Sequence, residues 1–151
     1  MNFRIEVDAQ KDEEVIIRCK KIDGRIERLQ RMLNEGAVAA LTLVFYRGDE
    51  EYYFSVEDIY FFETSGDSVF AHTAQDSYLV KQRLYELEQM LPRHFVRVSK
   101  GGILNAKHVF SLQKNLASTS LVKFSKGHKQ VFVSRHYYSE LKQRLAERGN
   151  L

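Results

Sequence analysis

Residues 59–80 of the chain, IYFFETSGDSVFAHTAQDSYLV, decide the class of fold. Three short runs rich in apolar and aromatic residues lie within it, at 59–64, 69–73 and 77–80. Serine, glycine and aspartate separate the first two runs, and Gln75-Asp76 separates the last two. Aromatic and β-branched residues favour strands, whereas glycine, serine and aspartate favour turns. This stretch therefore predicts consecutive short strands joined by turns.

The same pattern continues on both sides of this stretch. Further strands are predicted at 41–46, 51–55, 95–98, 109–113, 121–125 and 130–133. Leu84, Leu87 and Leu91 mark a short helix that ends before Pro92, and a last helix begins near Ser134. Residues 41–151 are therefore predicted to form a mainly β domain with flanking helices, of the α+β class.

Residues 1–40 read as a separate β-β-α extension. The alternation at 3–7 and the apolar run at 15–19 each predict a strand. A helix follows, with Asp23 near its start, Gly36 as its stop and an apolar stripe of Ile22, Ile26, Leu29 and Leu33. We expect this extension to dimerise or bind a partner, or else to pack as a lid on the β domain.

Composition argues against several classes of protein. The ten Phe and eight Tyr supply large apolar surface to bury, which argues against disorder, and no signal peptide or spanning segment is visible. A single cysteine, Cys19, excludes a disulfide framework within the chain and a cysteine-based zinc cluster. We expect a cytoplasmic protein with no enzymatic activity, no cofactor and no bound metal.

Charge is divided unevenly along the chain. Residues 47–92 carry three basic and ten acidic residues, net −7, whereas residues 93–151 carry twelve basic and two acidic, net +10. A basic segment of this kind favours a polyanionic partner. The turn at 125–129 concentrates it, because Lys126, His128 and Lys129 follow one another there without an acid.

A second candidate contact lies at the start of the last helix. Ser134 is suited to the N-cap, which places Arg135 and His136 in the first turn. Cations there oppose the helix dipole at a cost of a few tenths to about 1 kcal/mol, so a functional reason is expected. The alternative is that Arg135 pairs with Glu140 or Glu147.

Three blocks in this order resemble the LytTR family of bacterial DNA-binding domains. They are DIYFFET at 58–64, FVRVSKGGILN at 95–105 and VFVSRHY at 131–137. The resemblance covers about residues 41–146 and implies elongated antiparallel β-sheets rather than a helix-turn-helix. It also implies double-stranded DNA as the partner, with loops at strand ends entering successive major grooves.

The resemblance assigns base contacts to three places: Ser68 in the turn 66–69, Lys100 with its neighbour Ser99, and Arg135. Arg97 is expected to meet a phosphate or an internal carboxylate such as Glu63. Asn105 is expected to cap the turn 106–108.

The chain departs from the family's pattern in two ways near these contacts: Ser99 stands where many members have His, and Gly101-Gly102 replaces larger residues. In the first contact turn, Asp67 is acidic and would be repelled by phosphate. We therefore expect the base preference of this turn to differ from that of other members of the family.

The segment before Leu41 has no room for a receiver domain, so the chain resembles the short stand-alone members. For these the resemblance implies control by a partner, such as a membrane protein encoded nearby. A homodimer on repeated half-sites would raise the affinity of one small domain. Two rival interpretations are an interaction module that has lost its DNA affinity and an RNA-binding β domain.

Overall fold

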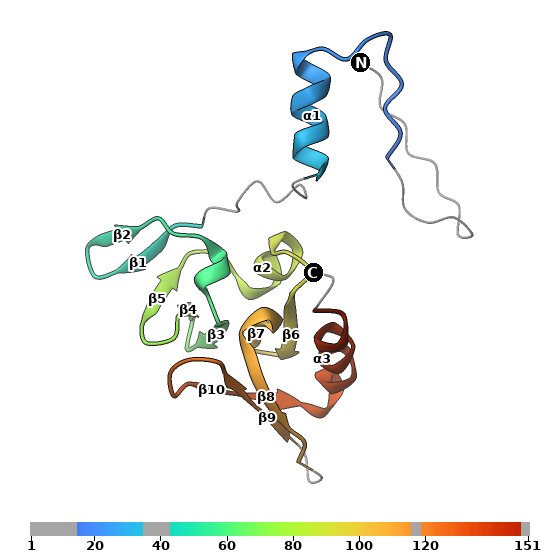
Figure 1. Ribbon diagram of the computed structural model, residues 1–151. Helices are drawn as coiled ribbons and strands as arrows, with labels where there is room; N and C mark the ends of the chain where they lie inside the picture. Colours follow the sequence, from blue (N-terminus) through green and yellow to red (C-terminus); the bar gives the residue numbers. More distant parts are fainter. Residues whose placement is uncertain (1–14, 35–42, 116–118, 149–151) are drawn as a thin grey trace. The chain divides into compact units, whose positions relative to one another are not determined.

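The computed structural model describes residues 15–34, 43–115 and 119–148. It divides the chain into two compact units, Met1–Ala37 and Val38–Leu151 (Figure 1). No described helix is both long and apolar enough to cross a membrane.

The described part of unit 1 contains one helix, α1, Gly24–Asn34. Asp23 begins it, because its Oδ1 accepts hydrogen bonds from the backbone N–H groups of Arg25 at 3.0 Å and Ile26 at 3.2 Å. The strand predicted at 15–19 is wrong: these residues have no regular structure, since no described segment of unit 1 pairs with them. The predicted strand 3–7 and the stop at Gly36 lie outside the described residues.

Unit 2 is built on a seven-stranded antiparallel sheet, called sheet A, in the order β2-β1-β5-β4-β3-β7-β6. Its strands are β1 Phe45–Arg47, β2 Glu50–Tyr52, β3 Phe61–Ser65, β4 Ser68–His72, β5 Ser77–Val80, β6 Phe95–Ser99 and β7 Gly102–Asn105. Strand β7 was not predicted. It lies between β3 and β6 and is buried at every position, so its sequence lacks the alternation of a half-buried strand.

A second antiparallel sheet, sheet B, has three strands in the order β10-β9-β8. They are β8 Val109–Gln113, β9 Thr119–Phe124 and β10 Gln130–Ser134. The remaining elements are α2 Leu84–Met90, α3 Arg135–Glu147 and two single-turn 3₁₀ helices, η1 Val56–Asp58 and η2 Ala106–His108. The predicted class, mainly β with flanking helices, is confirmed.

Two hydrophobic cores form because neighbouring residues of a strand face opposite sides of sheet A. Phe62 joins the first core, to which α2 contributes Leu84 and Leu87. Phe61 joins the second, which unites sheet A with sheet B and with Leu141 of α3. Sheet B and α3 therefore cover the face of sheet A that α2 leaves open (Figure 1).

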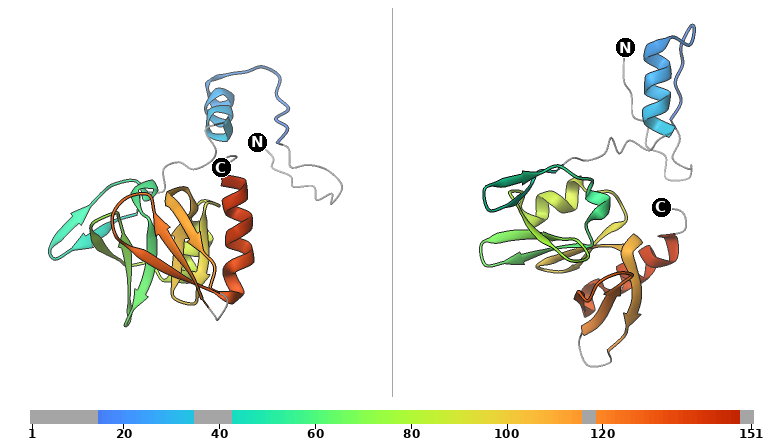
Figure 2. Two further views of the ribbon diagram at one scale, coloured as in Figure 1. Left: turned by 60° about the horizontal axis from the view of Figure 1, so that its bottom comes forward. Right: turned by 60° about the vertical axis from the view of Figure 1, so that its left-hand side comes forward.

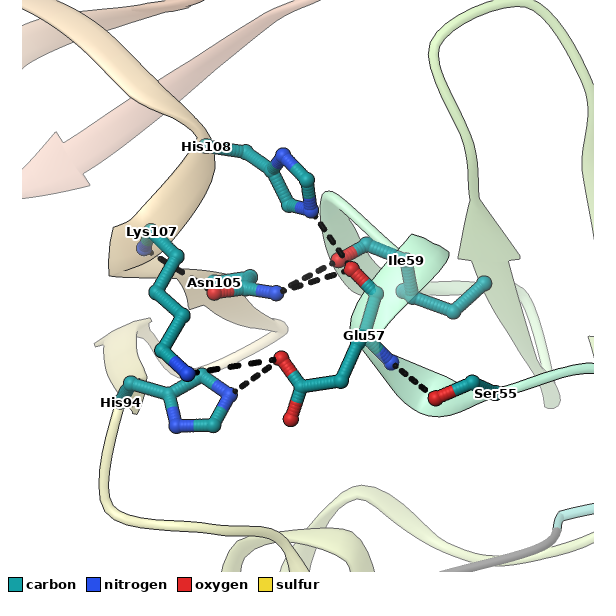
Figure 3. Close-up of polar contacts among 7 residues, drawn as sticks. All are labelled: Ser55, Glu57, Ile59, His94, Asn105, Lys107 and His108. Atoms are coloured by element: carbon teal, nitrogen blue, oxygen red, sulfur yellow. Dashed lines mark hydrogen bonds and ion pairs between the residues drawn. The ribbon is translucent and has the colours of Figure 1, made fainter. Parts of the chain in front are cut away.

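Buried polar contacts join η1 to the end of β7, as Figure 3 shows. The Asn105 side chain is completely buried, donates to the Ile59 carbonyl at 3.1 Å and accepts from Lys107 N at 3.0 Å. The predicted cap of the turn 106–108 is thus confirmed. His94 Nε2 lies 2.9 Å from Glu57 Oε2, and burial lowers the pKa of His94 although Glu57 opposes the shift.

Candidate nucleic-acid interface

Three of the predicted contact segments lie on one side of unit 2. Strands β3 and β6 both pair antiparallel with β7, so they run in the same direction and end at the same edge of sheet A. The backbone N–H of Thr64 donates to the Gly101 carbonyl at 2.8 Å, which ties the β3–β4 turn to the β6–β7 turn. In the left view of Figure 2 the end of β3 and the start of α3 face the same, lower side. We call residues 65–68, 99–102 and 134–136 the reading edge.

The β3–β4 turn is a two-residue hairpin loop, closed by the pairing of Ser65 with Ser68. Gly66 adopts φ 59° at the first central position, as a type II′ turn requires. Asp67 is exposed at the tip and Ser68 is half-buried behind it. The residue predicted to contact a base therefore stands beside an exposed carboxylate.

The β6–β7 turn presents Lys100, which is exposed, next to the half-buried Ser99. Gly102 starts β7 in close contact with Ser99, since a Cβ at Gly102 would lie 3.0 Å from Ser99 Oγ. A larger residue at this position would push against the Ser99 side chain. Glycine here therefore keeps the turn tight.

Arg97 supports this turn from inside. Its Nε donates to the Ser99 carbonyl at 2.7 Å, and its Nη2 donates to the Lys100 carbonyl. Its Nη1 lies 2.7 Å from Glu88 Oε2 of α2, and only 16% of the side chain is exposed. Arg97 therefore meets a carboxylate of the protein, one of its two expected partners, but it is that of Glu88, 9 residues earlier in the chain, and not that of Glu63.

Ser134 occupies the N-cap position of α3 with φ −70° and ψ 153°, but its side chain makes no capping hydrogen bond. Arg135 and His136 are exposed in the first turn, as predicted. Of the two carboxylates considered as partners of Arg135, Glu140 also binds Arg144 at 3.1 Å and Glu147 also binds Arg93 at 3.1 Å.

The tip of the β9–β10 hairpin, residues 125–129, packs against the β4–β5 turn. Gly127 has φ 79°, and a Cβ there would lie 2.4 Å from the Ala74 carbonyl oxygen. Lys129 Nζ donates to the Asp76 carbonyl at 2.6 Å. Lys126 and His128 remain exposed on the tip.

Lys129 therefore differs from the two other basic residues predicted on this tip. Its Nζ lies 3.2 Å from Nδ1 of His72, and burial lowers the pKa of Lys129. His72 Nε2 lies 2.8 Å from Glu63 Oε1 without hydrogen-bond geometry, and burial also lowers the pKa of His72. Lys129, which the sequence predicts as a DNA contact, thus joins sheet B to sheet A.

Sequence reasoning missed the residues that hold these turns in place, namely Glu88, Ala74 and Asp76. Glu88 lies 9 residues before its partner Arg97, and Asp76 lies 53 residues before Lys129, so no local pattern shows either contact. Within the described residues no cluster of three or more His, Cys, Asp or Glu side chains could hold a metal ion.

Comparison with known proteins agrees with this geometry. Residues 49–146 match the model of the LytTr DNA-binding domain. The chain belongs to the LytTR family. Unit 2 as a LytTR domain accounts for the antiparallel sheets and for the three blocks that carry the sequence resemblance.

Solved structures and curated relatives extend this finding. A LytTr DNA-binding domain of a methyl-accepting/DNA response regulator from Bacillus cereus has the same fold, with a TM-score of 0.63 and 22% identity over 69% of this chain and 95% of that chain. An uncharacterized HTH-type transcriptional regulator of Staphylococcus aureus strain MSSA476 is 30% identical over 97% of this chain and 99% of its own length. Its counterpart in strain MRSA252 is 29% identical over the same shares.

These relatives carry a name that refers to a helix-turn-helix, whereas this LytTR domain is built differently. Helices α2 and α3 are separated by five strands, so they do not form a helix-turn-helix pair. Because the match extends over 148 residues, the relatives also share a segment corresponding to unit 1.

Proposed function

We propose that this LytTR protein is a sequence-specific regulator of transcription that reads double-stranded DNA with its reading edge. The observation that carries the proposal is the joint position of the β3–β4 and β6–β7 turns, held together by the hydrogen bond from Thr64 to Gly101. Rigid placement of several base-contacting side chains supports recognition of a sequence rather than of charge alone.

Each part of the edge has its own role in this proposal. Lys100 and Arg135 contact base edges in the major groove, with Ser68 and Ser99 as further hydrogen-bonding groups. His136 lies against a phosphate, and so do Lys126 and His128, which are outside the reading edge on the β9–β10 tip. Arg97 and Lys129 act by positioning the turns, because their donors already bind the protein itself. The protein acts in the cytoplasm and catalyses no reaction.

Helix α1 supports a second part of the proposal, which is association of two copies. Its apolar residues Ile26, Leu29 and Leu33 recur at spacings of three and four, the spacing of a coiled-coil seam, and Leu33 is 39% exposed. An isolated helix of 11 residues is marginal in water, so pairing of this stripe would stabilise it. A second copy on a repeated half-site is the partner we propose, and a membrane-protein regulator is the alternative occupant.

Titration of duplex DNA at several salt concentrations tests the function. With a duplex selected from a random pool, Arg135→Ala should weaken specific binding by about 1–3 kcal/mol and relax the preference at one base pair. Lys126→Ala should weaken binding to every duplex and lower the salt slope by about 1.

The matched control is Arg93→Ala, which removes an exposed arginine paired with Glu147 and away from the reading edge. It should leave base preference unchanged. A protein that binds no duplex even at low salt would contradict the proposed function and favour an interaction module.

A further inference from the structure

The outer face of sheet B exposes large apolar side chains. Alternate residues of β8–β10 point away from the second core, and among them Phe110 is 76% exposed and Phe132 is 65% exposed. Phe132 pairs across the strands with the half-buried Leu121. Full burial of a phenylalanine side chain contributes about 1.5–3 kcal/mol, so a partner that covered this face would bind favourably.

Phe110 lies in a β-bulge, next to Val109, which is buried in the second core. The register of β8 against β9 shifts between Val109 and Ser111, so Phe110 is the extra residue, and Ser111 pairs with Lys123. Lys123 is exposed and lies diagonally across from Phe132. We call Phe110, Leu121, Lys123 and Phe132 the basic aromatic face.

The charge around this face limits what can cover it. The sequence contains no Asp or Glu between Glu88 and Glu140, and Lys123 is an exposed cation within the face itself. A partner surface must therefore combine carboxylates with apolar or aromatic groups, because unmatched cations in an interface are costly.

The same chain carries a surface of this kind on the β1–β2 hairpin. Asp49, Glu50 and Glu51 are all exposed there, and Tyr53, which follows β2, is 66% exposed. The Tyr53 hydroxyl donates to Glu51 Oε2, which fixes an aromatic ring beside a carboxylate. Within the described residues β2 has no strand on its outer side, so the hairpin is also an open sheet edge. We call these four residues the acidic hairpin.

The two surfaces lie at different ends of unit 2. Sheet A ends at β2 on one side and at β6 on the other, and sheet B packs at the β6 side through the core that contains Val96 and Val98. Figure 1 and the right view of Figure 2 show the β1–β2 hairpin and strands β8–β10 at separate ends of the unit. Surfaces arranged in this way join copies head to tail instead of closing a symmetric pair.

We propose that the acidic hairpin of one copy docks on the basic aromatic face of the next copy when two copies occupy neighbouring DNA sites. This contact rests on the DNA-binding function proposed above. It makes the binding of the two copies cooperative, and it is separate from any pairing of α1.

The test uses the full chain and duplexes that carry either one selected site or two tandem copies of it, with the spacing varied around one and two helical turns. At a permissive spacing the second copy should bind at least about fivefold tighter than to a single site. Lys123→Glu and Glu51→Lys should each remove this gain, because each places like charges across the contact. The double variant Lys123→Glu with Glu51→Lys should restore it, because the exchanged charges attract again.

The control Lys142→Glu changes the same charge on an exposed position of α3 and should keep the cooperativity. Phe132→Ser, at an exposed site that the fold tolerates, should remove it. Independent binding of two wild-type copies at every spacing would overturn the proposal, as would cooperativity that Leu29→Glu in α1 abolishes and Lys123→Glu does not. Both results would leave single-site binding intact, whereas failure of the DNA-binding function would remove single-site binding itself.

Discussion

Replacing Arg97 by glutamine should separate a positioning role from a direct contact with DNA. The guanidinium donates to the carbonyls of Ser99 and Lys100 and pairs with Glu88, so its loss frees the β6–β7 turn. Ordering a residue's backbone on binding costs about 1–2 kcal/mol. Two residues that must be ordered again, Lys100 and Gly101, therefore lower specific affinity by about 2 kcal/mol, which is roughly 30-fold.

The salt dependence of binding distinguishes the two roles. A phosphate contact contributes about 0.9 to the slope of log K against log salt, whereas a positioning residue contributes nothing to it. Arg97→Gln should therefore lose affinity for the selected duplex and keep the wild-type slope. Arg97→Lys should behave in the same way, because lysine keeps the charge and loses the planar fork that binds several acceptors.

Fluorescence anisotropy at four salt concentrations, on a selected and a scrambled duplex, measures both quantities. Arg93→Gln serves as the matched control, since it removes an arginine that pairs with Glu147 far from the turn. A slope that falls by about 0.9 in Arg97→Gln and is restored in Arg97→Lys would refute the positioning role and assign Arg97 to a phosphate.

Asn105→Ala should lower the free energy of unfolding by about 2–4 kcal/mol in urea titration, because it leaves buried backbone groups unpaired; Gln113→Ala, on an exposed position, should change it little. Because burial lowers the pKa of His94 in the folded protein, the His94 side chain of the unfolded chain becomes protonated at a higher pH than that of the folded chain. The free energy of unfolding should therefore fall as the pH drops below about 6.5. His94→Gln should flatten that fall, and an unchanged pH profile would refute the assignment. Gly127→Ala should cost at least about 1–3 kcal/mol, from its positive φ and its contact with the β4–β5 turn, whereas Gly24→Ala, with open space around it, should not destabilise the protein.

The sequence predicts features that depend on local chemistry. Half-buried strands alternate, so β4, which runs from Ser68 to His72, was found from its pattern. The cap that Asn105 provides to η2 spans two residues and was also predicted. The N-cap position of Ser134 was correct, although its hydroxyl makes no capping bond.

Features that depend on packing between distant segments were missed. Strand β7 is buried on both faces, so Ile103 and Leu104 give no period that marks a strand. Lys129 was read as a surface cation, but its partners His72 and Asp76 lie more than 50 residues earlier in the chain. The strand expected at 15–19 failed for the converse reason, since a suitable local pattern forms a strand only where another segment pairs with it.

Selection of bound sites from a pool of random duplexes measures whether the reading edge recognises sequence. We expect enrichment of one sequence whose specified base pairs fall in successive major grooves on one face of the duplex, about 10 base pairs apart. Replacement of Arg135 by alanine should remove one of these preferences and leave the others unchanged. A bound pool as random as the starting pool would contradict sequence-specific reading by this edge.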